Sequence, residues 1–298
     1  MKARIGDIRR VTQVAFCFLA NAYVSVCFRD KIYKGPLKAT CLPFIYCHAC
    51  PSATFSCPMG TFQHYAVVHQ VPFFLLGHLM VIGLLIGRMA CGWLCPFGLV
   101  QDLLHVNSRT IHVPDHVARG LRIIPYLTLG LLVIAIPFYT SEHWFSKLCP
   151  LGTMVAGIPW ALWNPVDPET GERLLASNPP GLLFGTKLML LAGFILLFVW
   201  VKRPFCRFVC PMGLIWSFFN KISVLQLAVD TAHCDQCDTC HKTCPVDIKV
   251  YEDPNSTSCI RCLRCTQCAH VRVVTPMLAF GKGCRWPEGL PKEGSEIA

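Results

Sequence analysis

Long apolar runs alternate with polar segments rich in cysteine and proline along the 298 residues of the chain. Four of the runs are close to the roughly 17 to 25 residues that a helix needs to cross a membrane. They predict transmembrane helices at residues 11–28, 71–87, 121–139 and 181–201. Prolines near the ends of the second and third runs are tolerated there and indicate that these helices continue into the flanking loops.

Composition and charge agree with a membrane protein. Hydrophobic residues make up 53% of the chain, charged residues only 15%, and the formal net charge is +10. Basic residues gather in residues 1–10, in residues 88–120 and from Lys202 onward, so the positive-inside rule places both termini in the cytoplasm of a multi-pass protein of the cell inner membrane. The basic loop at residues 29–38 is an exception, because four helices place it outside. Since topology accounts for the positive charge, we exclude nucleic acid as a partner.

Two halves of the chain follow the same pattern. Each reads as an apolar helix, a CPxGT motif outside, a second helix and a CxxxCPxG motif inside. The outer motifs start at Cys57 and Cys149, and the inner motifs start at Cys91 and Cys206. Halves of equal topology pack as parallel repeats about an axis along the membrane normal. We therefore expect a mainly α fold, with a four-helix transmembrane bundle built from two parallel repeats over residues 1–228.

Two tandem cysteine runs lie near the C-terminus. The first, CDQCDTCHKTCP, fits the spacing that gives three thiolates to one 4Fe-4S cluster and the fourth to its neighbour. The second, CIRCLRCTQCAH, has a shorter last gap. Both runs together predict an α+β ferredoxin-like domain at residues 229–284 with two 4Fe-4S clusters, followed by a tail at residues 285–298. The expected ligands are Cys234, Cys237, Cys240 and Cys268 for one cluster, and Cys244, Cys259, Cys262 and Cys265 for the other.

Two other interpretations of these runs are weaker. Residues 237–241, CDTCH, match the attachment pattern of a c-type haem, but they are embedded in the cluster motif and are expected in the cytoplasm. A four-cysteine zinc site is the second alternative. Zinc sites favour two separated CxxC knuckles over continuous runs.

The inner motifs, CGWLCPFG and CRFVCPMG, follow the second and fourth apolar runs. A CxxxC spacing places both sulfurs on one face of a helical turn. We expect the proline to end that turn and the glycine to let the chain reverse. The hypothesis is one further 4Fe-4S cluster, held across the two halves by Cys91, Cys95, Cys206 and Cys210. In the alternative, these small side chains pack the helix ends.

The outer segment holds a second group of four cysteines. Cys47 and Cys50 form a CxxC pair, and the repeat symmetry brings Cys57 toward Cys149. The four thiols are candidates for another cluster. They are equally candidates for disulfides, which are common in exterior segments. The spacing leaves both alternatives open.

The inner motifs and the tandem runs resemble the membrane-bound ferredoxin-type proteins of the NapH, MauN and NosR type, over approximately residues 70–270. The resemblance implies four helices, two 4Fe-4S clusters and quinol oxidation or an equivalent electron relay. The expected function is an iron-sulfur subunit between the quinone pool and partner redox proteins, within a multi-subunit complex, either as a quinol dehydrogenase component or as a subunit that only conducts electrons. A maturation protein that reduces or delivers a metal and an anchor for a soluble reductase are the alternatives. The cysteine-rich outer loop departs from the family pattern.

Overall fold

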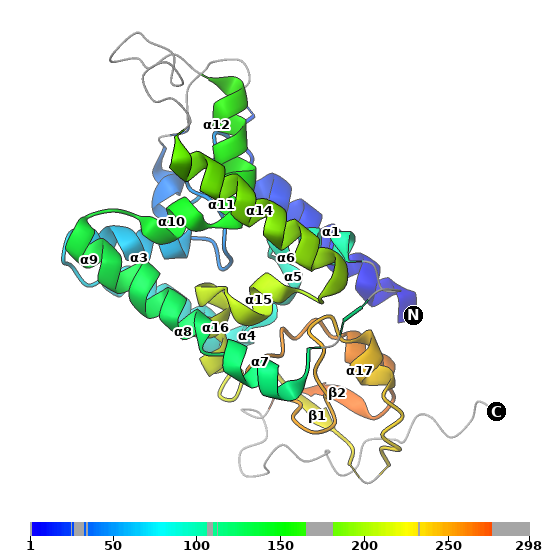
Figure 1. The fold of residues 1–298 in the computed structure, drawn as a ribbon. Helices are drawn as coiled ribbons and strands as arrows, with labels where there is room; N and C mark the ends of the chain where they lie inside the picture. The colour runs from blue at the N-terminus through cyan, green and yellow to red at the C-terminus, as the bar shows by residue number, and fades with distance from the viewer. Residues whose placement is uncertain are drawn as a thin grey trace.

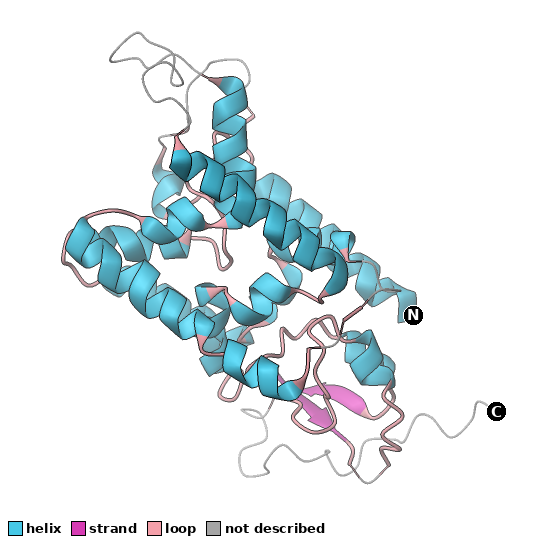
Figure 2. Ribbon diagram, viewed as in Figure 1, coloured by secondary structure: helices cyan, strands magenta, loops and turns pink. Residues whose placement is uncertain are grey.

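The computed structural model describes residues 2–24, 26, 33, 35–105, 110–111, 113–164, 181–231 and 233–275. The chain is mainly helical, with one small sheet near its C-terminal end (Figures 1 and 2). All of the expected tail, at residues 285–298, and the end of the first expected helix, at residues 27–28, lie outside the described residues.

Two helical segments have the length and composition of a membrane span. One covers His116–Thr140 and the other is α14 (Leu182–Trp200). They agree with the third and fourth expected helices. In the most apolar 18-residue stretch of each segment, only 22% and 11% of the residues are buried inside the protein. Most of this apolar surface therefore faces outward. The first segment is built from α7 (Asp115–Leu121), α8 (Ile124–Leu127), the π-helical η3 (Thr128–Ala135) and α9 (Ile136–Thr140).

The first two expected helices differ from the prediction. At about 1.5 Å per residue, α4 (Phe73–Ile86) is about 21 Å long, shorter than the roughly 30 Å hydrocarbon core. Helix α1 (Lys2–Ala20) begins in the charged N-terminal segment and ends at Ala20. Its Arg9 is fully buried, so this charge makes tertiary contacts. The described residues thus contain two, not four, helices with the length and composition of a membrane span.

Every CPxG motif begins a helix. The cysteine is the N-cap and the proline is the first helical residue, where its fixed φ and missing N–H are tolerated. The expected chain reversal at the glycine is therefore wrong, because the glycine lies within the first helical turn. These helices are α3 (Pro58–Val67), α6 (Pro96–Leu104), α11 (Pro150–Gly152), which continues through η4 (Thr153–Gly157) and α12 (Ile158–Trp163), and α16 (Pro211–Phe219).

Three short helices lie beside the cysteine motifs. Helices α5 (Met89–Trp93) and α15 (Pro204–Phe208) carry the first cysteine of each inner motif, and α10 (Trp144–Leu148) precedes Cys149. A 3-10 turn, η1 (Pro36–Ala39), precedes the outer cysteine loop.

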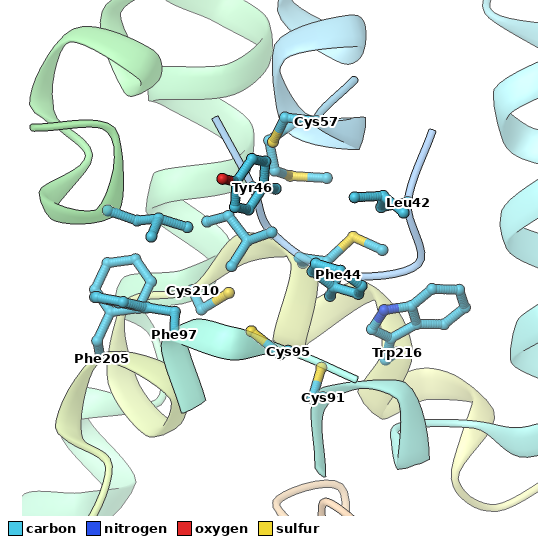
Figure 3. Packing of buried hydrophobic residues seen from close by; sticks show 14 of the residues in the cluster. Leu42, Phe44, Tyr46, Cys57, Cys91, Cys95, Phe97, Phe205, Cys210 and Trp216 are labelled. Atoms are coloured by element: carbon cyan, nitrogen blue, oxygen red, sulfur yellow. The ribbon is translucent and has the colours of Figure 1, made fainter. Parts of the chain in front are cut away.

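The loop at residues 41–57 enters the protein interior. Phe44 and Tyr46 are almost fully buried, between the outer Cys57 and the inner cysteines (Figure 3). The Trp216 indole of α16 donates a hydrogen bond to the Pro43 carbonyl, 3.1 Å away. Through this loop, one hydrophobic core includes cysteines of both the outer and the inner motifs.

The C-terminal domain has the expected α+β character. Strand β1 (Gln226–Val229) pairs antiparallel with β2 (Val271–Val274), with Val229 opposite Val271. Between them lie α17 (Thr239–Thr243) and the 3-10 turn η5 (Arg264–Gln267). The first strand begins before the expected boundary at residue 229. A second core of apolar side chains and cysteines packs under this ribbon.

Candidate iron-sulfur centres

The four cysteines expected for one ferredoxin cluster line a single cavity. Apolar side chains such as Leu227 and Val250 complete its wall. All four thiols belong to residues that are only 6 to 7% exposed. Four cysteines around one largely apolar cavity are a donor set that suits a 4Fe-4S cluster. The four are Cys244, Cys259, Cys262 and Cys265.

Burial keeps the thiols of Cys244 and Cys259 neutral in the absence of metal. It raises the pKa of Cys244 to about 11 and the pKa of Cys259 to about 12. Binding of iron would replace the protons, because the thiolate is the form that binds metal.

The second ferredoxin set is less completely assembled. Cys240 is buried and lies within electrostatic range of Cys268 and Cys234, which pack partly buried on the same core. Cys237 is exposed, and its hydrogen bond with the Thr239 hydroxyl, at 3.3 Å, lowers the pKa of its thiol. The structure therefore brings three of the four expected ligands together. It also places Cys268 beside Cys240, despite the irregular spacing of its motif.

The four inner cysteines, one pair from each half of the chain, converge. Cys210 lies within electrostatic range of Cys206, Cys91 and Cys95. Figure 3 shows Cys91, Cys95 and Cys210 pointing into the same space. Each of the four residues is 3 to 9% exposed. Burial raises the pKa of Cys91 to about 11, although Arg88 and nearby Arg203 act against it.

The sulfur of a CPxG cysteine can also accept a backbone hydrogen bond. The Gly213 N–H donates to the Cys210 sulfur at 3.4 Å, whereas Cys57, Cys95 and Cys149 cap their helices without such a bond. The Gly213 amide belongs to the first helical turn, where it has no partner within the helix. Hydrogen bonds to cluster sulfurs are a recognised determinant of reduction potential. A cysteine can therefore be a helix cap and a cluster ligand at once.

The inner glycines make room for two arginines that sequence reasoning missed. A Cβ on Gly98 would lie 3.1 Å from the Arg203 guanidinium, and one on Gly213 would lie 2.7 Å from that of Arg88. Each arginine thus packs against the motif of the other half. The signal that was available is an arginine three residues before the first cysteine of each motif, in RMAC and RPFC.

A buried ionic network surrounds the inner cysteines. Arg203 donates two hydrogen bonds of 2.6 Å to the Asp102 carboxylate, which also accepts one of 2.6 Å from Arg9. Burial by itself would raise the pKa of Asp102, but the two arginines outweigh it and lower that pKa to about 2. Gln101 donates to the Cys206 sulfur at 3.0 Å. The network therefore places positive charge beside thiolates that would carry negative charge.

The ferredoxin-like domain packs directly on α5. The Trp93 indole donates to the Arg261 carbonyl at 3.1 Å, and the Arg88 guanidinium donates to the Thr257 carbonyl at 2.8 Å. At Gly92 a Cβ would overlap the Ile260 carbonyl oxygen and lie 3.5 Å from the Cys262 Cα. The loop that carries Cys262 therefore lies against the short helix that carries Cys91.

The outer cysteines are arranged differently from the expectation. Cys47, Cys57 and Cys149 line one cavity together with His48. Cys50 is not among the residues that line it. Burial raises the pKa of Cys47 and that of Cys149 to about 12. Three of the four expected thiols thus meet, and the described cysteines form no disulfide with one another.

The spacing of donors gives no support to a mononuclear metal site. Within the described residues, no group of three or more His, Cys, Asp or Glu side chains is close enough to hold one metal ion. A zinc site requires four ligands on a single ion. A cluster is bound by ligands on separate irons, so its sulfurs stand farther apart.

Comparison with known proteins finds two segments of the chain that are similar to an iron-sulfur domain. A family model described as a 4Fe-4S binding domain matches it at residues 68–114 and again at residues 183–227. Each segment contains one inner CxxxCPxG motif, and the tandem runs at residues 234–268 lie outside both. No solved structure matches the chain.

Several curated proteins are similar to the chain at modest identity. The ferredoxin-type protein NapH of Haemophilus influenzae is 25% identical over 249 residues, which cover 80% of this chain and 73% of NapH. An uncharacterized protein of Methanocaldococcus jannaschii is 27% identical over 192 residues, 61% of this chain and 69% of the relative.

The methylamine utilization ferredoxin-type protein MauN of Paracoccus denitrificans is 27% identical over 166 residues, 53% of this chain and 48% of MauN. These matches confirm the resemblance that the motifs predicted. The chain is therefore related to ferredoxin-type proteins such as NapH and MauN, and it contains two segments that match a 4Fe-4S binding domain.

Proposed function

We propose that the chain is a membrane subunit that carries electrons between the quinone pool and partner redox proteins, within a multi-subunit respiratory complex. Three ligand sets take part: the four inner cysteines and the two ferredoxin sets. Clusters held by these ligands would supply one-electron transfer. The protein holds the ligand sets next to one another and excludes water from them.

The contact between α5 and the ferredoxin-like domain is the observation that carries this proposal. Gly92 stands beside Cys91, and its missing side chain lets the Cys262 backbone approach. One hydrophobic core contains Cys91 and Cys95 of the inner set and Cys244 and Cys262 of the ferredoxin set. One apolar core that joins two ligand sets is suited to electron transfer between them. Two separate structural sites would not require this connection.

The membrane location rests on exposed apolar surface. In α14 and in His116–Thr140, most of the apolar side chains face away from the protein. Such large apolar patches are found on soluble monomers only rarely, and a bilayer would cover them. With the basic segments in the cytoplasm, the ferredoxin-like domain lies on the cytoplasmic side.

Burial of the inner thiols counts against the maturation alternative. A thiol that reduces or delivers a metal to another protein has to be reached by that protein. The most exposed of the four inner cysteines, Cys91, is only 9% exposed. A ligand role requires no such access.

Iron counting with one cysteine variant tests the proposal. The full chain is purified anaerobically in detergent, iron and acid-labile sulfide are counted, and EPR spectra are recorded during titration with a quinol analogue. The inner cluster adds about four irons to the eight of the ferredoxin pair, so Cys91→Ser should lose about four irons per chain. In this variant quinol should no longer reduce the ferredoxin clusters.

Cys17→Ser is the matched control, because Cys17 lies in α1 outside all the ligand sets and contacts Asn21. It should retain all the iron and be reduced like the unmodified protein. Equal iron in the two variants, with quinol reduction intact in both, would contradict the proposal.

A further inference from the structure

The outer cavity joins three cysteines and a histidine. We infer that it binds an iron-sulfur centre through Cys47, Cys57, Cys149 and His48, with the His48 imidazole in the position expected for Cys50. The role of this centre in electron transfer rests on the proposed function. The ligand set itself is argued from the geometry of the cavity.

Two of the four donors come from the outer CPxG motifs. Cys57 and Cys149 are the N-caps of α3 and α11. Both residues are buried, at 5% and 7% exposed. Like the CPxG cysteines of the inner site, each caps a helix that begins at the proline that follows it.

The other two donors come from the buried loop. The Cys47 sulfur lies 3.7 Å from the position of a Cβ on Gly152, so it rests on the first turn of α11. The His48 Nδ1 lies 2.6 Å from the position of a Cβ on Gly60, so the ring rests on the first turn of α3. His48 therefore fills the space that Gly60 leaves open, Cys47 packs against Gly152, and both line the cavity with the two motif cysteines.

The inner site shows why these positions matter. There the equivalent space beside each CPxG glycine is filled by a guanidinium, from Arg203 at Gly98 and from Arg88 at Gly213. A guanidinium has no lone pair to give to a metal. A thiolate and an imidazole are both common metal ligands. The outer loop thus supplies donors where the inner site has cations.

The remaining outer cysteines have other partners. The Cys50 sulfur lies 3.5 Å from the Asn21 side-chain oxygen and 3.4 Å from the Ser52 hydroxyl. The Cys41 sulfur lies 3.3 Å from the Thr61 hydroxyl. Neither residue lines the cavity. His48 is therefore the fourth donor that the cavity offers.

Histidine ligation has a measurable consequence. In iron-sulfur centres, replacement of cysteine by histidine raises the reduction potential, because a neutral imidazole replaces an anionic thiolate. A centre with three cysteines and His48 should have a higher potential than the same centre with four cysteines. His48→Cys creates that comparison in the same cavity.

The experiment uses the full chain, purified anaerobically in detergent, with four variants. Cys57→Ser should lose about four irons per chain, and His48→Ala should lose the EPR signal of the same centre. His48→Cys should keep the iron, with a lower midpoint potential and a changed EPR signal. Cys50→Ser is the matched control and should keep both the iron and the potential. His48→Cys and Cys50→Ser are conservative changes, so the test does not depend on variants that fold poorly.

Three outcomes would overturn the inference. The first is loss of iron in Cys50→Ser with no effect of either His48 variant, which would make Cys50 the ligand. The second is unchanged iron in Cys57→Ser together with a disulfide among the three cysteines, detected by mass spectrometry. The third is an unchanged potential in His48→Cys. In each case quinol reduction of the ferredoxin clusters, measured in parallel, shows whether the proposed function survives.

Discussion

Asp102 is the single carboxylate that neutralises two buried arginines, so its removal tests the ionic network around the inner cysteines. The Arg9 and Arg203 side chains are 0% and 1% exposed, and each lies 2.6 Å from the Asp102 carboxylate. Asp102→Asn keeps the shape and can still accept hydrogen bonds, but it leaves two cations without a counter-charge. Breaking a buried ion pair by removal of one partner costs about 3 to 5 kcal/mol. We expect a loss of this size in the free energy of unfolding.

The pH dependence of stability provides a second measure of the same network. The folded-state pKa of Asp102 is lowered from 3.8 to about 2, so its contribution is fully present above pH 3.8 and is lost as the pH falls through 2. A shift of this size corresponds to about 2 kcal/mol, at 1.36 kcal/mol per pKa unit. In Asp102→Asn this part of the acid sensitivity should be absent.

Chemical unfolding in detergent, under anaerobic conditions, measures both effects. Glu142→Gln is the control, because Glu142 forms an ion pair of 2.7 Å with Lys147 on the surface. The Glu142 side chain is 49% exposed and the Lys147 side chain is 33% exposed. Exposed pairs contribute at most about 1 kcal/mol. Equal, small losses in the two variants would refute the conclusion that the network stabilises the inner site.

Three further predictions concern the contact between the domains and the metal. Gly92→Ala should weaken docking of the ferredoxin-like domain by about 1 to 3 kcal/mol, since its Cβ would overlap the Ile260 carbonyl. The control is Gly193→Ala in α14, where the space around the glycine is open. Equal sensitivity of the C-terminal domain to proteolysis in the two variants would contradict this prediction. Trp93→Phe removes the hydrogen bond to Arg261 and should cost about 0.5 to 1.5 kcal/mol in unfolding measurements. Removal of iron by an anaerobic chelator should lower the melting temperature, because the apo sites retain buried, neutral thiols; an unchanged melting temperature after complete iron loss would count against cluster binding in the core.

Residue spacing predicted the structure well where a local motif fixes the positions of the cysteines or of a helix. Cys244, Cys259, Cys262 and Cys265 line one cavity, as expected from tandem runs that each fix three positions and from the cross-ligation that fixes the fourth; their role as cluster ligands stays a prediction. Convergence of the four inner cysteines followed from the similarity of the two halves. The helix over residues 181–201 also agrees within one residue at each end, since a long apolar run has few alternatives.

The predictions failed where tertiary contacts decide the outcome. Helix α1 starts in a charged segment because Arg9 finds a buried partner in Asp102, which is 93 residues away in the chain. The apolar run after it could not reveal this. Cys50 was placed with Cys47 because of a CxxC spacing, but a turn in the buried loop directs its thiol toward Asn21. Spacing gives the separation of two cysteines and not the direction of their side chains.

The CPxG glycine shows most clearly what local reasoning leaves out. Its sequence context, directly after Cys-Pro, is typical of a turn, and a turn was predicted. In the structure it is an ordinary helical residue. A side chain is absent there because another group occupies the space, Arg203 at Gly98 and His48 at Gly60. The motif is the same at both sites, so the difference in chemistry between them comes from the residue that a distant segment places against the glycine. A family pattern built on the motif alone can therefore predict where a cluster is held, while the potential and ligand type of each centre depend on partners outside the motif.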